Sequence, residues 1–295
     1  MDQAGTLRKI MNGRSPVKSE GLKALKVISV TSGKGGVGKT NIVANLAVSL
    51  QKQGLKVLLL DGDFGLANLN IVIGMEPRGT VTDVISGAKD VSDIVLTGPA
   101  GVKLIPSSTG ILKASQLSLA DKTILMDRLE AAHIPFDILL IDTGAGINSD
   151  VTYLNAAASE VIVVTTPEPT AITDAYALMK VMSQEHNVKR FKLLVNMSAD
   201  EREATTVFRN LLDVADQFLN VSIEYLGWVP YDRQVSQAVM GRRILCERFP
   251  DSPAAKAFQC IAAGLSGPSN GAVSPMITGN LQFFWRTLMI NEVNA

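Results

Sequence analysis

The sequence predicts an α/β fold: a doubly wound, mostly parallel sheet with helices on both of its faces. Segments of strand length alternate with segments of helical periodicity along most of the 295 residues. The strand segments are continuous apolar runs, which is typical of parallel strands that are covered on both sides. Several of these runs end in an acidic residue or a glycine-rich turn, as strands do beside a ligand site in such sheets.

The composition narrows the function classes. Hydrophobic residues make up 46% of the chain, which is enough for a sizeable core. Lysine plus arginine and aspartate plus glutamate both number 28, so the chain lacks the basic surplus of a nucleic-acid-binding protein and we expect no direct contact with nucleic acid. The two cysteines, Cys246 and Cys260, fit neither a disulfide framework nor a metal site. Because no apolar run has transmembrane length and no signal-peptide core is present, we expect a cytoplasmic protein whose membrane contacts are peripheral.

The first predicted strand, residues 27–30, leads into a glycine-rich loop and then a helix with apolar residues at Ile42, Leu46 and Leu50. Residues 33–40 match the phosphate-loop motif G-x-x-x-x-G-K-[ST] at every fixed position, in the strand–loop–helix context that the motif requires. Glycines let successive backbone N–H groups turn towards an anion, and the helix N-terminus adds a field that favours phosphate. A glycine-rich turn without a ligand is the alternative, and the complete motif makes it the weaker one.

Two side chains of this loop carry predicted chemistry. Lys39 would bridge the β- and γ-phosphates of a nucleotide, and the Thr40 hydroxyl would ligate Mg²⁺. The other residues expected to cradle the nucleotide are Gly33, Lys34, Gly35, Gly36, Val37, Gly38 and Asn41.

Two later strands end in acidic residues. The apolar run over 56–61 ends in Asp61, with Asp63 two residues on, and the run over 137–142 ends in Asp142. The carboxyl ends of parallel strands meet at the ligand edge of the sheet, where carboxylates hold Mg²⁺ or orient an attacking water. One such aspartate is compatible with an ordinary loop residue. Together with the phosphate loop, the pattern favours a Walker B role for Asp142 and a metal or catalytic role for Asp61 and Asp63.

The remaining elements continue the alternation of strand and helix. Continuous apolar runs indicate strands, a 3.6-residue apolar period indicates helices, and strict alternation indicates an edge strand. The expected helices are 81–85, 116–132, 203–219, one through Ala175, Leu178, Met179 and Met182, and a last core helix through Val235, Ala238 and Val239. The expected strands are 102–106, 160–165, 191–196 and an edge strand over 221–225.

The N-terminal stretch over residues 2–12 is weakly amphipathic. It places Ala4, Leu7, Ile10 and Met11 on one helical face, ahead of a turn and a basic linker. Composition alone favours a poorly ordered tail over a docking peptide.

The C-terminal stretch carries a stronger stripe. A linker rich in glycine, serine and proline over 263–279 precedes residues at the spacing i, i+3, i+4, i+7, i+8. These residues are Leu281, Phe284, Trp285, Leu288 and Met289. Such a helix lies in a membrane interface, docks on a partner or packs on its own domain, and the first two together are favoured. Arg286 is the only basic residue over 280–295, so we expect the attraction of this segment to anionic lipid to be weak.

A lysine directly after the first glycine gives the phosphate loop the sequence G-K-G-G-V-G-K-T, which resembles the deviant Walker A motif of the MinD/ParA family of ATPases. The resemblance covers about residues 25–262 and includes Asp61-x-Asp63-x-Gly65-Leu66-x-Asn68 and the Asp142 segment. It implies a P-loop NTPase fold of the SIMIBI type, ATP or ADP with Mg²⁺ as ligands, and a homodimer formed around two ATP molecules. Lys34 of one subunit would reach the phosphates bound by the other, as an arginine finger does.

The family also implies roles for further residues. Asp63 would position the attacking water, and Asp61 would support the switch. Glu168 would approach the nucleotide across the dimer interface. The residues implied to recognise adenine are Asn196 and the loop with Pro230 and Asp232.

Three stretches resemble more closely a branch of this family that regulates flagellar number. They are Asp2-Gln3-Ala4-Gly5-Thr6-Leu7-Arg8, residues 168–178 and residues 229–232. The resemblance implies that the N-terminal segment docks on a flagellar GTPase of the signal-recognition-particle type and stimulates it, in place of the tail that composition favours. It further implies a flagellar transcriptional activator and switch components as partners, and peripheral membrane association at the cell pole in the ATP state. The sequence departs from the family pattern at Asn41 and Asn70 and in its lysine-poor C-terminal segment.

The expected function is a slow, dimerisation-dependent Mg²⁺-ATPase that acts as a switch in the regulation of flagellar number and placement. Two alternatives remain: a partner-binding repressor module with secondary ATPase activity, and an ATPase that positions DNA or another cargo. The expected organisation is an N-terminal docking helix and linker over 1–24, an ATPase domain over 25–262, a flexible linker over 263–279 and an amphipathic helix over 280–295.

Overall fold

The computed structural model describes residues 26–63, 68–106 and 119–267, and an eight-stranded sheet forms its centre. The strands are β1 (Lys26–Ser32), β2 (Val57–Gly62), β3 (Leu96–Thr97), β4 (Lys103–Ile105), β5 (Ile138–Ala145), β6 (Glu160–Thr165), β7 (Arg190–Ser198) and β8 (Ser222–Pro230). The helices are α2 (Lys39–Lys52), α3 (Leu69–Ile73), α4 (Val81–Ser86), α5 (Val91–Ile94), the 3-10 turn η1 (Pro99–Gly101), α6 (Leu119–Ala131), α7 (Ser149–Ala157), α8 (Pro169–Glu185), α9 (Glu201–Phe218), α10 (Arg233–Met240), α11 (Leu245–Arg248) and α12 (Pro253–Ser266).

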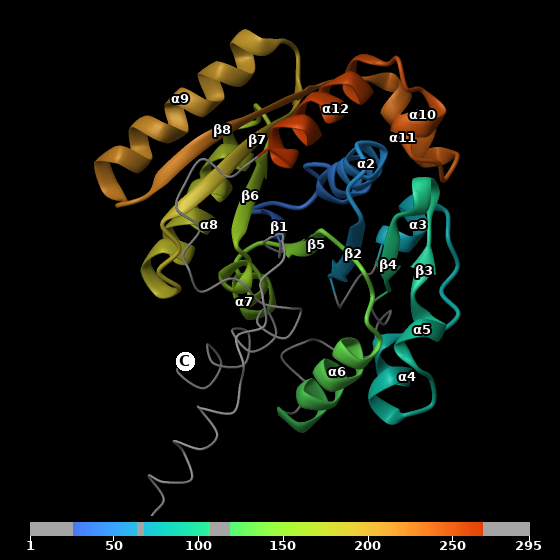
Figure 1. Ribbon diagram of the computed structural model, residues 1–295. Helices are drawn as coiled ribbons and strands as arrows, with labels where there is room; N and C mark the ends of the chain where they lie inside the picture. Colours follow the sequence, from blue (N-terminus) through green and yellow to red (C-terminus); the bar gives the residue numbers. More distant parts are fainter. Residues whose placement is uncertain (1–25, 64–67, 107–118, 268–295) are drawn as a thin grey trace, which may run out of the picture.

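The strand order is β3-β4-β2-β5-β1-β6-β7-β8, and helices cover both faces of the sheet (Figure 1). Neighbouring strands are parallel, except that β3 and β4 at one edge are antiparallel. This confirms the predicted doubly wound, mostly parallel fold, with β8 as the predicted edge strand. The chain winds outwards from β1 in both directions, so the carboxyl end of β1 is the switch point at which such sheets bind ligands.

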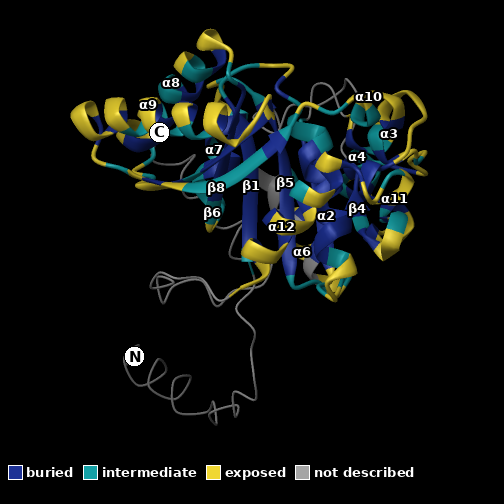
Figure 2. Ribbon diagram, turned by 90° about the horizontal axis from the view of Figure 1, so that it is seen from above, coloured by how far each residue is buried: buried dark blue, intermediate teal, exposed yellow. Residues whose placement is uncertain are grey.

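Burial explains the continuous apolar runs. Every residue of β2 is buried, and so is every residue of β1 after Lys26. Figure 2 shows the central strands as a buried interior between helices with exposed outer faces, whereas the edge strand β8 is mostly of intermediate burial. Residues 42–50 of α2 are all buried because the sheet lies on one side of this helix and α12 packs on another. In the part of the chain that the structure describes, no helix has the length and apolarity needed to cross a membrane.

The helix predicted through Val235, Ala238 and Val239 is confirmed as α10, but it is not the last core helix, and Val239 is exposed. In α10 only Ala238 is buried, and Met240 is 78% exposed. The helix that closes the core is α12, which contacts α2 and β8 and buries Phe258, Ile261 and Leu265. The sequence hides this helix because alanines fill much of its buried face, and alanine gives a weak periodic signal.

The predicted boundary between the ATPase domain and the C-terminal linker, after residue 262, falls inside α12. The Ser252 hydroxyl accepts a hydrogen bond from the Ala255 N–H and so caps the helix, which continues to Ser266. Residues 263–266 are therefore helical rather than part of a linker. Residues 268–279 of that linker, the stripe over 280–295 and the N-terminal segment over 1–24 lie outside the described residues, and these predictions stay predictions.

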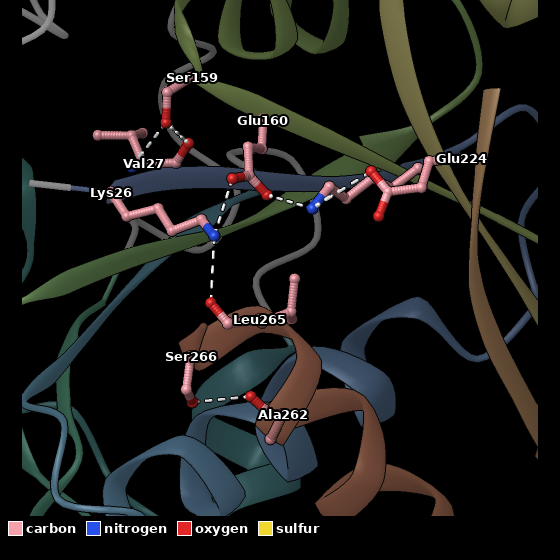
Figure 3. Close-up of polar contacts among 9 residues, drawn as sticks. Lys26, Val27, Ser159, Glu160, Glu224, Ala262, Leu265 and Ser266 are labelled. Atoms are coloured by element: carbon pink, nitrogen blue, oxygen red, sulfur yellow. Dashed lines mark hydrogen bonds and ion pairs between the residues drawn. The ribbon is translucent and has the colours of Figure 1, made fainter. Parts of the chain in front are cut away.

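A row of charged side chains crosses the amino ends of the strands (Figure 3). The Lys26 ammonium lies 2.8 Å from the Glu160 carboxylate and donates to the Leu265 carbonyl at 3.1 Å, which joins β1 and β6 to the end of α12. Lys192 of β7 lies 3.1 Å from the other Glu160 oxygen and 3.7 Å from Glu224 of β8. We call Lys26, Glu160, Lys192 and Glu224 the charged clamp. The charged clamp links four strands and one helix at the amino ends of the strands, opposite the end that carries the phosphate loop.

Candidate nucleotide-binding site

The phosphate loop connects β1 to α2 in a conformation that depends on glycine. Gly36 and Gly38 have φ angles of +83° and +86°, which L side chains rarely adopt. A Cβ on Gly38 would also lie 2.5 Å from the side-chain nitrogen of Asn196. The Ser32 hydroxyl donates to the Lys34 carbonyl at 2.8 Å and tightens the start of the loop.

The first glycine of the motif is fixed by packing rather than by φ. A Cβ on Gly33 would lie 2.0 Å from the Asp174 carbonyl oxygen of α8. The loop backbone therefore rests directly on the backbone of α8, a contact that no larger residue permits.

Two acidic residues meet beside the loop. Asp61 of β2 and Asp142 of β5 are register partners on adjacent parallel strands, and both are at most 2% exposed. The Lys39 ammonium lies 3.8 Å from Asp142 Oδ1. The sheet thus brings together the lysine of the loop and the two strand-end acids, as the sequence predicts.

Burial raises the pKa of Asp61 to about 7, and the nearby charge of Asp142 adds to this effect. The N–H groups of Asp63 and Leu69 donate to the Asp61 carboxylate at 3.2 and 3.1 Å and oppose the rise. Burial likewise raises the pKa of Asp142 to about 6, against the opposing effects of Lys39 and the Thr40 hydroxyl. Two buried acids of like charge therefore lie beside one lysine.

This donor set fits Mg²⁺. Asp142 Oδ1 is buried and has no hydrogen-bond partner among the described residues, so an oxygen ligand is left for a cation. In the same described part of the chain, no group of three or more histidine, cysteine, aspartate or glutamate side chains has metal-site geometry. Mg²⁺ accepts such a sparse protein set, because it keeps waters and takes phosphate oxygens as further ligands. Thr40, Asp142 and Asp61 are the residues that would hold it.

The end of β5 after Asp142 lies against the end of β1, where the phosphate loop begins. The Gly146 N–H donates to the Ser32 carbonyl at 2.9 Å, and the Thr143 hydroxyl donates to the Val30 carbonyl at 3.1 Å. A Cβ on Gly144 would lie 3.8 Å from Asp63 Oδ1. Asp63 therefore lies beside the end of β5, and its role in positioning the attacking water stays a prediction.

A cavity of about 700 Å³ opens next to the phosphate loop, within the range of small-molecule sites. Residues 35–37 line one end, and residues 166–168 follow along the loop before α8. Met197, Glu203 and Tyr231 line the cavity as well. Met197 and Tyr231 are 41% and 67% exposed, so two large side chains present apolar surface beside a phosphate site, where a nucleobase would lie.

The polar groups predicted to contact adenine are engaged with the backbone. The Asn196 amide donates to the Val37 carbonyl at 2.8 Å and so holds the phosphate loop. Asp232 accepts from the Gln234 N–H at 2.8 Å and the Ala254 N–H at 3.3 Å, which fixes the starts of α10 and α12. Pro230 ends β8 directly before the cavity residue Tyr231. Asn196, Pro230 and Asp232 are each next in sequence to a residue that lines the cavity, Met197 or Tyr231, but they are not part of its lining, and their contact with adenine stays a prediction.

Lys34 is directed towards α8. Its ammonium donates to Glu168 Oε1 at 2.6 Å and to the Thr170 hydroxyl at 2.9 Å. The hydrogen bond from Lys34 first, and that from Thr170 second, hold the pKa of Glu168 below its usual range. The sequence predicts Lys34 and Glu168 as site residues that face a second subunit, and in the single chain they face each other.

Residues 23–266 match the sequence profile described as "ParA: NUBPL iron-transfer P-loop NTPase". The chain belongs to the ParA/MinD family of P-loop NTPases. The antiactivator FleN of Pseudomonas aeruginosa is 40% identical over 268 residues, 90% of this chain and 94% of FleN. The flagellum site-determining protein YlxH of Helicobacter pylori is 34% identical, over 97% of this chain and 98% of YlxH. The septum site-determining protein MinD of Pyrococcus horikoshii, solved with Mg-ADP, has a TM-score of 0.65 at 26% identity, over 82% of this chain and 96% of MinD.

These findings confirm the family and its FlhG-like (FleN) branch, which the sequence predicts from the deviant lysine and three short stretches. A ParA/MinD relative was solved with Mg-ADP, so nucleotide and Mg²⁺ binding are properties of this family. Sequence reasoning missed Met197, Glu203 and Thr170. Thr170 lies inside one of the matching stretches and so carried a signal, whereas Met197 and Glu203 carried none.

Proposed function

We propose that this chain is a Mg²⁺-dependent ATPase that regulates flagellar number or placement by switching between a single chain and an ATP-bound homodimer. The observation that carries the proposal is the meeting of Lys39, Thr40 and the buried Asp142 beside the phosphate loop. The relatives supply the biological setting, because one is named an antiactivator and the other a flagellum site-determining protein.

Each residue of the site has a separate role in the proposed hydrolysis of ATP. Lys39 and the loop N–H groups bind the phosphates, while Thr40, Asp142 and Asp61 would hold Mg²⁺, which would neutralise charge on the phosphoryl oxygens. Asp63, beside Gly144 at the end of β5, orients the attacking water. Asp61 fixes the start of the following segment through its bond from the Leu69 N–H.

Lys34 makes hydrolysis depend on a second subunit. Its ammonium is held by α8 in the single chain, on Glu168 and Thr170. Lys34 of the second subunit then supplies the positive charge at the phosphates, as an arginine finger does. Turnover is therefore slow at low protein concentration, where few dimers form.

The segments outside the described residues are the proposed outputs of the switch. Asp2, Gln3, Ala4, Leu7 and Arg8 dock on a flagellar GTPase of the signal-recognition-particle type, and a flagellar transcriptional activator and switch components are further partners. The stripe of Leu281, Phe284, Trp285, Leu288 and Met289 binds the membrane peripherally at the cell pole in the ATP state.

The test is phosphate release from Mg-ATP by the full chain over a range of protein concentrations. If catalysis requires a dimer, the rate per chain rises with protein concentration and then levels off. A rate per chain that is constant over a hundredfold range would contradict the dimerisation switch, and no phosphate release at any concentration would contradict the ATPase.

A further inference from the structure

Three groups around Lys34 bond to one another. The Lys34 ammonium donates to Glu168 and to Thr170, and the Thr170 hydroxyl donates to Glu168 Oε1 at 2.8 Å. We call Glu168 and Thr170 the α8 clasp. Thr170 is the central member, because its single hydroxyl bonds both charged partners.

The backbone holds the loop in place against the clasp. Gly33, directly before Lys34, rests on the Asp174 carbonyl, so the loop lies on the first turns of α8. Glu168 is the N-cap residue of α8 and Thr170 lies in its first turn, so the helix start presents both to Lys34. The contact therefore follows from how the loop packs on α8 and not only from the reach of a long side chain.

We propose that the α8 clasp restrains Lys34 in the single chain, and that it must open before Lys34 reaches a second subunit, so that Thr170 helps to set the protein concentration at which the ATP dimer forms. This inference rests on the dimerisation switch proposed above. The Lys34 ammonium uses two of its three N–H donors on Glu168 and Thr170, and a side chain that follows α8 of its own chain is not directed at a partner's phosphates. The clasp therefore reduces the fraction of chains that are competent to dimerise, and the apparent dimer affinity falls with that fraction.

The exposure of the clasp suits a reversible restraint. The side chains of Lys34 and Glu168 are 35% and 56% exposed, and ion pairs at such positions are weak. A weak contact opens readily when a phosphate competes for the same ammonium, whereas a buried pair would resist exchange.

The test compares Thr170→Val with the matched control Thr173→Val. Valine keeps the shape and β-branching of threonine and removes only the hydroxyl. Thr173 lies in the same helix, is exposed, and donates to the Pro169 carbonyl at 3.0 Å rather than to the clasp. The first measurement is the labelling rate of Lys34 by an amine-reactive reagent without nucleotide, read by mass spectrometry. We expect faster labelling in Thr170→Val and an unchanged rate in Thr173→Val; equal rates in both variants and wild type would contradict the clasp.

The second measurement is light scattering of the full chain with Mg-ATP as its concentration is varied. Thr170→Val should reach half-maximal dimer at a concentration about two- to tenfold lower than wild type, the factor expected when the two hydrogen bonds of one exposed hydroxyl are lost. Thr173→Val should follow wild type, and ATP affinity at concentrations too low for dimers should be the same in all three chains. Unchanged or weaker dimerisation of Thr170→Val overturns the inference while the proposed function stands. A wild-type chain that does not dimerise with ATP contradicts the proposed switch itself, before either variant is compared.

Discussion

The two ends of the sheet pair lysine with carboxylate in opposite ways. At the amino ends of the strands, Lys26 lies 2.8 Å from Glu160 and also donates to a helix carbonyl (Figure 3). At the carboxyl ends, Lys39 lies 3.8 Å from Asp142, and the buried Asp61 lies on the adjacent strand. The first arrangement pairs both Glu160 oxygens with lysines, and the second leaves one described carboxylate oxygen, Asp142 Oδ1, without a hydrogen-bond partner and so open to a cation. We infer that the charges at the amino ends of the strands stabilise the fold, whereas those at the carboxyl ends serve binding and lower the stability of the unliganded chain.

The largest expected effect is the difference between Lys39 and Lys26 in their contribution to Mg-ATP affinity. Lys39→Ala should weaken Mg-ATP binding by about a hundredfold or more, since it removes a preorganised charge from the phosphate site. Lys26→Met should leave the affinity for Mg-ATP unchanged. Calorimetric titration with Mg-ATP measures both variants, and comparable losses in the two would remove the functional distinction between the ends of the sheet.

The second prediction concerns the packing of the phosphate loop. Gly33→Ala should lower the free energy of unfolding by about 2–4 kcal/mol, because its Cβ would overlap the Asp174 carbonyl. Gly35→Ala is the control in the same loop, since no atom lies within 4 Å of a Cβ at that position. Urea unfolding without nucleotide compares the two. Equal stability of the variants would mean that the loop moves off α8 at little cost.

The third prediction uses the acids at the carboxyl ends. An acid with a raised pKa binds more protons in the folded chain than in the unfolded chain, so it stabilises the fold at low pH and loses this contribution as pH rises. Without Mg²⁺ and nucleotide, stability should therefore fall between about pH 4 and pH 7, where Asp61 ionises. Asp61→Asn should reduce the loss of unfolding free energy across this pH range by on the order of 2–3 kcal/mol. Urea midpoints at several pH values measure it; a parent and variant with parallel pH profiles would show that Asp61 is not the titrating group.

The smallest expected effect lies in the charged clamp. Lys26→Met should lower the free energy of unfolding by about 1–2 kcal/mol, because Lys192 still pairs with Glu160 when Lys26 is lost. Lys256→Met, at an exposed position of α12, is the matched control and should have little effect. Thermal unfolding compares the two. A loss in Lys26→Met no larger than in the control would show that the clamp does not secure α12.

The site was predictable from sequence where its chemistry is local. Residues 33–40 carry the whole phosphate loop within one strand–loop–helix unit, and Asp61 and Asp142 each end an apolar run. Parallel strands bring such ends to one edge without further information, so the meeting of the two acids followed from the fold class alone.

Other parts of the site depended on contacts between distant segments. The Asn196 amide donates to the Val37 carbonyl across 159 residues of sequence, and Asp232 accepts from the Ala254 N–H and so fixes the start of α12. Nothing in the neighbouring sequence marks these partners, because hydrogen bonds between distant segments form only once the sheet is assembled. The core position of α12 was missed for a related reason: its alanines fit only because α2 and β8 approach closely.

The fold class, the phosphate loop, the strand-end acids and the family could all be predicted from the sequence, because each depends on a short motif or on the period of apolar residues. The contacts of Lys34 could not, because they form only in the folded chain. Glu168 lies 134 residues further along the chain, and the packing of Gly33 on α8 is what brings the two together. The motif supplies a second lysine, and the fold supplies the clasp that holds it in the single chain.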